Sequence, residues 1–194
     1  MEEVLKSLVK IELKKCLKRK EFIFILLLMI IAITSDFVLT CMRFYGCKTS
    51  QLLSAYEATI ITNIIQTPFY PVFATLLPFT VSIIGSDIYI SEKINGIEDV
   101  VNTRISKKCN IISKAIAISI ISFFIVLIPL LINQVLSLVA FPIQGHNSFG
   151  LSEYKKLIYI DKGIMLSQVQ AYYPYLNNII FIIIRSIFAV SFTL

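Results

Sequence analysis

Residues 111–141 read IISKAIAISIISFFIVLIPLLINQVLSLVAF. This run is almost entirely apolar, with Pro129 near its centre. A membrane-spanning helix needs about 20 consecutive apolar residues, whereas the core of a soluble protein does not need a block this long. At about 1.5 Å of rise per residue, the run exceeds the roughly 30 Å hydrocarbon core of a bilayer. We therefore expect a helix that tilts or extends beyond the bilayer.

Three other apolar blocks accompany this run, at 22–39, 69–90 and 176–194. The 194 residues are 57% hydrophobic and 15% charged, whereas roughly a quarter of a soluble protein is charged. We predict an all-α fold: an integral membrane helical bundle with about four transmembrane helices, forming a single domain over 1–194. Because the last block has no polar flank, we also expect a fragment of a longer protein, truncated at its C-terminus.

The first 20 residues are strongly basic and contain seven Lys or Arg. Apolar residues recur at helical spacing, which predicts an N-terminal amphipathic helix in the headgroup region of the bilayer. A charged flank of the first crossing is the alternative. A cleaved signal peptide is disfavoured because there is no A-x-A site and the apolar run is long.

The distribution of basic residues predicts the orientation. Residues 1–20 and the central polar region together hold twelve Lys and Arg, while the two opposite loops hold five. This asymmetry places the N-terminus and the 91–110 loop in the cytoplasm of a multi-pass protein in the cytoplasmic membrane. It indicates a lipid bilayer as partner and does not suggest binding to nucleic acid.

The loop at about 41–67 carries two open questions. Its middle is predicted to form a short amphipathic helix through Leu52, Ile60 and Ile64. Cys41 and Cys47 could form a disulfide in an oxidising exterior, or remain two free thiols.

Known catalytic and nucleotide-binding motifs are absent from the sequence. There is no GxxxxGK[ST] loop, no HExxH and no G-x-S-x-G, and His146 is the only histidine. We therefore expect a protein that is not an enzyme and that has no cofactor, no metal and no ATP site of its own.

Two charged residues lie within the apolar blocks. Asp36 is expected in the last turn of the first crossing, where an interfacial role is favoured over a carboxylate on a proton path. Arg185 lies inside the fourth block. It is either an intramembrane arginine that needs a partner or an interfacial residue of a span that starts later.

The loop at 91–110 is the main polar region between the crossings. After Gly96, its apolar residues Ile97, Val100 and Val101 have helical spacing. A short helix with an apolar stripe and a charged rim could dock into a groove on another protein. A solvated turn on the headgroups explains the same pattern equally well.

The same loop resembles that of ABC-2 type ABC transporter permeases. The pattern starts with Asp87, Glu92 and Gly96, continues as NTRISKK at 102–108, and ends at Lys114, which opens a long apolar helix. The basic N-terminal segment LKKCLKRKEFIFILLL is also similar to that family. The resemblance covers most of residues 1–140.

The resemblance implies a membrane permease whose cytoplasmic coupling helix contacts a separate ATP-binding cassette ATPase subunit. That partner would bind the ATP, and a second permease copy or homologue would complete the pathway. The implied contact residues are Glu92, Gly96, Arg104, Lys107 and Lys108. Family permeases have about six spans, so four spans agree with a fragment. The alternative is a non-transporting membrane interaction, immunity or accessory protein.

Overall fold

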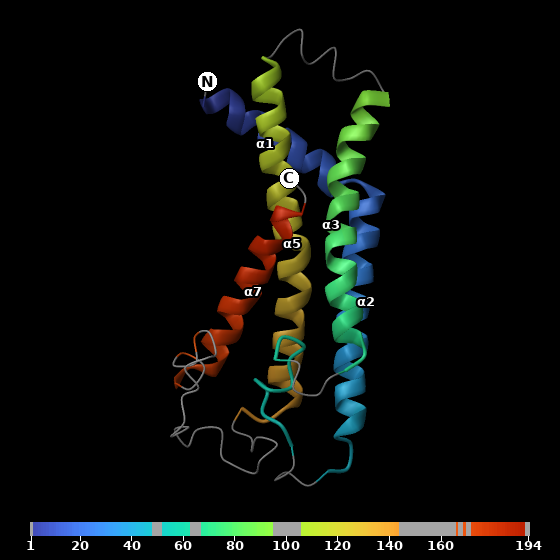
Figure 1. Cartoon of the computed structure of the whole chain (residues 1–194), viewed down its shortest axis with the longest axis vertical. Helices are drawn as coiled ribbons and strands as arrows, with labels where there is room; N and C mark the ends of the chain where they lie inside the picture. The colour runs from blue at the N-terminus through green and yellow to red at the C-terminus, as the bar shows by residue number, and fades with distance from the viewer. Residues whose placement is uncertain are drawn as a thin grey trace. The chain divides into compact units, whose positions relative to one another are not determined.

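A computed structural model describes residues 2–47, 52–62, 67–94, 106–143, 166, 169 and 172–192. Regular secondary structure in this part of the chain is helical (Figure 1), which confirms the all-α prediction for these residues. The helices are α1 (Glu2–Leu17), α2 (Lys20–Arg43), α3 (Phe69–Ile94), α5 (Lys107–Ala140) and α7 (Pro174–Ser191).

Three of these helices, α2, α5 and α7, are long and apolar enough to cross a membrane. They correspond to the crossings predicted at 22–39, 111–141 and 176–194, with α5 ending at Ala140 and α7 at Ser191. Three such helices indicate a multi-pass membrane protein. The second predicted crossing, 69–90, lies in α3. The apolar part identified in α3 is Phe69–Ile83, which is shorter than the other three, so the crossing by α3 stays a prediction.

The helix ends differ from the predicted ends by a few residues. The predicted N-terminal helix stops at Leu17, because the Lys18 and Arg19 amides turn back to the carbonyl groups of Lys15 and Cys16 at 3.3 and 3.1 Å. The helix α2 continues to Arg43, beyond the end at residue 39 that the sequence predicts. Gly46 then has a φ of 78°, which suits a glycine as the chain leaves the helix.

The chain divides into two compact units, which are described separately. Unit 1 comprises Met1–Met29, Ala74–Val126 and Ser186–Leu194; unit 2 comprises Ile30–Phe73 and Leu127–Arg185. Each of α2, α3, α5 and α7 therefore contributes residues to both units.

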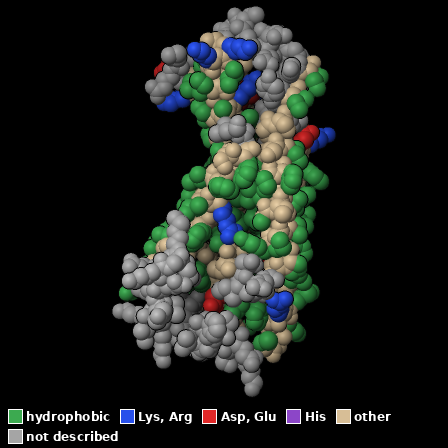
Figure 2. All heavy atoms as spheres, viewed as in Figure 1, with side chains coloured by type: hydrophobic (Ala, Val, Ile, Leu, Met, Phe, Trp, Pro, Cys, Tyr) green, Lys and Arg blue, Asp and Glu red, His purple; other side chains and the backbone are tan. Residues whose placement is uncertain are grey.

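The core of unit 1 is an apolar cluster. Cys16 from α1, Ile25 from α2 and Ile121 and Ile125 from α5 are all buried together. The last turns of α1 thus pack on α2 and α5, and in Figure 1 α1 crosses these helices instead of running along them. Figure 2 shows Lys and Arg side chains gathered near α1, as the basic composition of 1–20 requires.

The core of unit 2 is formed around the segment 52–62. Ala55, Ala58 and Phe141 are buried, and the Phe44 ring meets the Phe141 ring edge-on with centroids 6.2 Å apart. This segment consists of turns, so the prediction of an amphipathic helix is wrong for its described part, which includes Leu52 and Ile60. Ile64 lies outside the described residues. The physical reason is that other parts of unit 2, including α5 and α7, supply partners for main-chain groups of the segment.

Candidate functional site

The candidate site is the buried segment 52–62 together with the polar side chains that hold it in unit 2. Every residue from Leu53 to Ile61 is buried. Backbone without helix or sheet is tolerated at membrane depth only where protein or a water-filled cavity satisfies its polar groups. The main-chain groups of this segment therefore need hydrogen-bond partners within unit 2.

A reciprocal pair of side chains shapes the start of the segment. The Ser54 hydroxyl accepts from the Glu57 amide, and the Glu57 carboxylate accepts from the Ser54 amide and hydroxyl, all at 3.3 Å. This is the hydrogen-bond pattern of a capping box. Here the pattern closes a tight turn, and the described residues that follow form turns instead of a helix. Burial raises the pKa of the Glu57 carboxyl group, and the two hydrogen bonds from Ser54 lower it in part.

Asn133 of α5 holds the second half of the segment. Its Oδ1 accepts a hydrogen bond from the Ile60 amide at 3.0 Å. The first half is held at the Ala55 amide, which donates to the Pro142 carbonyl at 2.9 Å. Both contacts join main-chain groups of the segment to α5 or to the chain just after it.

Asn178 of α7 makes the largest number of these polar contacts. Its Nδ2 donates to the Thr59 hydroxyl and to Gln134 Oε1, each at 3.0 Å, and approaches the Tyr56 carbonyl at 3.5 Å. One amide side chain therefore links α7 to α5 and to the segment.

Arg185 lies within α7, which begins at Pro174 and so slightly earlier than the predicted fourth crossing. Its Nη2 donates to the Ile61 carbonyl at 3.3 Å and lies 3.5 Å from the Tyr70 hydroxyl. The guanidinium carbon is 5.6 Å from the centre of the Tyr70 ring, within cation–π range. Arg185 thus has the partners that an intramembrane arginine requires.

Asp36 is buried, with 2% of its surface exposed, and accepts a hydrogen bond from the Thr67 hydroxyl. The expectation that Asp36 lies in the last turn of the first helix is wrong, because α2 continues to Arg43. Thr67 comes shortly before α3, so this bond links α2 to the chain that leads into α3.

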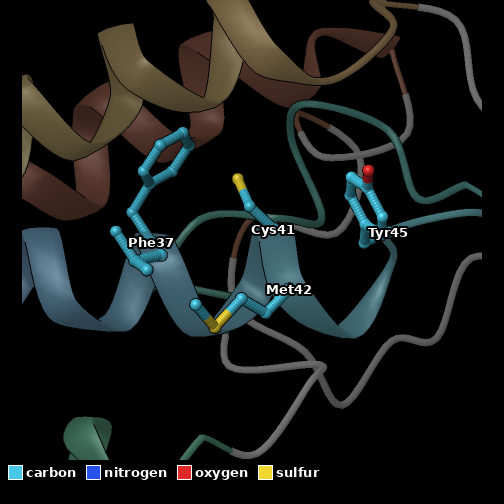
Figure 3. A pocket seen from close by; sticks show the side chains of 5 residues that line it. Phe37, Cys41, Met42 and Tyr45 are labelled. Carbon is cyan, nitrogen blue, oxygen red and sulfur yellow. The ribbon is translucent and has the colours of Figure 1, made fainter.

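An apolar hollow of about 440 Å³ lies along the end of α2, lined by Phe37, Val38, Cys41, Met42 and Tyr45. Figure 3 shows Phe37 and Cys41 pointing to one side, toward α5 and α7, while Met42 points away. Cys41 and Cys47 are separate thiols and form no disulfide with each other.

Several buried amide atoms of unit 2 have no hydrogen-bond partner among the described residues. They are Asn133 Nδ2, Gln134 Nε2, Asn177 Oδ1 and Asn178 Oδ1. Together these atoms offer two donors and two acceptors, which is the chemistry for holding a neutral polar group such as an amide. The described residues contain no group of three His, Cys, Asp or Glu side chains that could hold a metal ion.

The predicted ATPase-contact residues lie apart from this site in the chain, and only part of them can be described. Lys107 and Lys108 are exposed in the first turn of α5. Glu92 belongs to α3, but its side chain is outside the description. Gly96 and Arg104, with the rest of the predicted coupling helix, lie outside the described residues.

The prediction from sequence missed the four amide residues, Asn133, Gln134, Asn177 and Asn178. A usable signal was present, because they form two adjacent pairs: NQ interrupts the apolar run 111–141, and NN lies near the start of the block 176–194. Polar side chains in such runs are costly in a membrane and usually mark a function or a helix contact.

No protein-family model, no curated protein and no solved structure matches this chain.

Proposed function

We propose that this chain is a permease subunit of an ATP-binding cassette transporter in the cytoplasmic membrane. In this proposal it moves substrate across the membrane, and a separate ATPase subunit hydrolyses the ATP. The observation that carries the proposal is the buried polar network of unit 2, formed within helices whose outer surfaces are apolar.

The two faces of α5 illustrate this contrast. Val135 and Val139 are 58% and 82% exposed, whereas Asn133 and Ser137 are 1% and 0% exposed. An anchor helix needs only the apolar face, since a polar side chain in a bilayer has a free-energy cost that function or specific contact must offset. Polar groups turned inward and apolar groups turned outward are the arrangement expected of a helix that lines a pathway.

The sequence of the central loop supports the ATPase as partner. The resemblance to ABC-2 type permeases rests on this loop, where Glu92, Arg104, Lys107 and Lys108 are the proposed polar contacts and Gly96 the turn. ATP binding would close the ATPase dimer, and the loop would transmit that movement as a rigid-body motion of the helices. A second permease copy or homologue would complete the pathway.

Charge reversal in the loop tests the proposal. The full chain is co-expressed with a candidate ATP-binding cassette ATPase from the same genome, and variants Glu92→Lys and Arg104→Glu are compared with wild type. We expect both variants to lose co-purification of the ATPase and the stimulation of its activity. The amount of chain inserted in the membrane should stay the same. Lys48→Glu, a charge reversal in the loop on the opposite side, is the matched control and should behave as wild type.

Two results would contradict the proposal. One is that no ATPase co-purifies with the wild-type chain, which would favour a non-transporting accessory or immunity protein. The other is that the loop variants bind and stimulate the ATPase as well as wild type does.

A further inference from the structure

The helices α5 and α7 hold the segment 52–62 largely by its main chain. Asn133 accepts from the Ile60 amide, while Asn178 and Arg185 donate to the carbonyl groups of Tyr56 and Ile61. These three contacts reach peptide groups, and Asn178 adds one hydrogen bond to a side chain, the Thr59 hydroxyl. Any peptide that reached this position in an extended or turning form could make the same bonds.

The same amide residues have hydrogen-bonding capacity that the segment does not use. Asn133, Gln134, Asn177 and Asn178 are 1%, 6%, 3% and 1% exposed, and each has one polar atom without a partner among the described residues. A carboxamide side chain carries a donor and an acceptor, as a peptide group does. The buried amides of α5 and α7 therefore match the chemistry of a peptide backbone.

The side chains of the segment indicate which peptides would fit. Ala55, Ala58, Ile60 and Ile61 are all buried, so much of the space around this backbone accepts small and aliphatic side chains. The polar and aromatic side chains of Ser54, Tyr56, Glu57 and Thr59 are buried in the same segment. Of the side chains from α5 and α7 that contact the backbone here, Asn133 and Asn178 are neutral amides and only Arg185 is charged. A mainly apolar stretch of peptide with a few hydroxyl groups and one acidic side chain, like residues 52–62 themselves, is the complementary ligand.

We propose that these residues of α5 and α7 form a binding site for the backbone of an apolar peptide, and that residues 52–62 occupy this site as an internal ligand that a transported peptide displaces. The interpretation of this site as a substrate site rests on the proposed permease function. It restricts the transported substrates to peptides. The binding event itself requires no ATPase.

Competition with the internal ligand determines the expected behaviour. A tethered segment acts at a high effective concentration, on the order of millimolar, so an added peptide binds weakly while the segment is in place. A substitution that weakens only the binding of segment 52–62 should raise the apparent affinity for the added peptide, because the fraction of chains with an open site rises. A second substitution that removes a contact made by α7 should lower the apparent affinity for the peptide again.

The test measures peptide binding to the full chain in lipid nanodiscs by fluorescence anisotropy. The probe is a fluorescein-labelled synthetic peptide, LLSAYEATIIT, with the sequence of residues 52–62. Ile60→Pro removes the amide hydrogen that Asn133 accepts, and we expect it to tighten probe binding about tenfold. Adding Asn178→Leu to that variant should weaken binding about tenfold, while adding Ile179→Leu, an exposed neighbour, should leave binding unchanged.

A second probe separates backbone recognition from nonspecific binding of an apolar peptide. An ester in place of the amide at the position of Ile60 removes the N–H and keeps every side chain. We expect this depsipeptide to bind Ile60→Pro less tightly than the amide peptide does.

Several outcomes overturn the proposal: no binding to Ile60→Pro, equal affinity of wild type and Ile60→Pro, or equal affinity of the ester and amide peptides. If circular dichroism shows that Ile60→Pro has lost helix, binding is measured on a variant with Gly and Ser in place of residues 54–61. Absence of peptide binding to that variant also overturns the proposal. Peptide binding without ATPase stimulation would refute the permease function alone. ATPase stimulation without peptide binding would refute only the peptide site.

Discussion

The two compact units differ in the kind of contact that forms their cores. In unit 1, buried apolar side chains from α1, α2 and α5 meet around Ile121 and Ile125. In unit 2, a segment without helical structure is buried, and the side chains of Asn133, Asn178 and Arg185 reach its main chain. The same helices α2 and α5 take part in both.

This difference indicates what specifies each unit inside a bilayer. Lipid tails are as apolar as isoleucine, so apolar helix faces gain from close packing but little from leaving the lipid. A polar group has no such substitute in hydrocarbon and needs a particular partner. The cluster of unit 1 therefore depends on the shape of its side chains, whereas unit 2 adds directional hydrogen bonds to its own apolar cluster.

The largest effect is expected from a cavity in the core of unit 1. Ile125→Ala removes three carbon atoms at a position with 0% exposure, so we expect the free energy of unfolding to fall by about 3 kcal/mol. Unfolding in mixed micelles titrated with SDS measures this change. Ile116→Ala, at an exposed position of the same helix, is the control and should change stability by less than about 0.5 kcal/mol. Equal effects of the two variants would show that packing does not specify unit 1.

A smaller loss is expected when the central amide of unit 2 becomes apolar. Asn178→Leu keeps the size of the side chain and removes its bonds to Thr59 and Gln134. We expect a cost of about 1.2 kcal/mol, because each hydrogen bond between membrane helices contributes roughly 0.6 kcal/mol. The same micelle titration gives the value, with Ile179→Leu as control. If Asn178→Leu matches or exceeds wild type in stability, hydrogen bonding does not specify unit 2.

The smallest effect is expected from pH, because the stability of unit 2 should depend on the ionisation of Glu57. Burial raises the pKa of Glu57 above its ordinary value of 4.5. Below pH 4.5 the Glu57 carboxyl group is protonated in both the folded and the unfolded protein. As the pH rises, the unfolded chain loses this proton first. The folded state therefore loses stability until the pH passes the raised pKa of Glu57 in the folded protein. Glu57→Gln should therefore have a higher Tm than wild type at about pH 8 and the same Tm at about pH 4.

A matched variant sharpens the pH experiment. The Ser54 hydroxyl donates to the Glu57 carboxylate and lowers its pKa in part. Ser54→Ala should therefore make the loss of Tm with rising pH larger than in wild type. A Tm difference between Glu57→Gln and wild type that is constant with pH would contradict the assignment to this carboxylate.

The helices of this protein could be predicted from the sequence, because each is a continuous apolar or amphipathic block and needs no distant partner to form its own hydrogen bonds. The buried segment could not be predicted. Ile60 and its neighbours look like one face of a short helix, but Asn133, which binds the Ile60 amide, is 73 residues away. Local periodicity contains no information about such a partner.

The same limit applies to the two charged residues. The sequence left Arg185 either an intramembrane arginine in need of a partner or an interfacial residue. Ile61, whose carbonyl it contacts, lies 124 residues earlier, and nothing in the local pattern points to it. For Asp36 the sequence supported an interfacial role, since the end of α2 could not be located to within one turn. Its partner, Thr67, is 31 residues away.

The long separation between these partners has a consequence for the order in which the protein can be assembled. The segment 52–62 emerges from the ribosome well before Asn178, which is 119 residues beyond Thr59. At about 5–20 residues per second, roughly ten seconds pass before the amide side chain exists. During that time the main-chain groups of the segment have no partner on α7, so water, headgroups or the insertion machinery must provide one. Unit 2 can therefore be completed only after α7 has been synthesised, and the burial of residues 52–62 belongs to the late steps of folding.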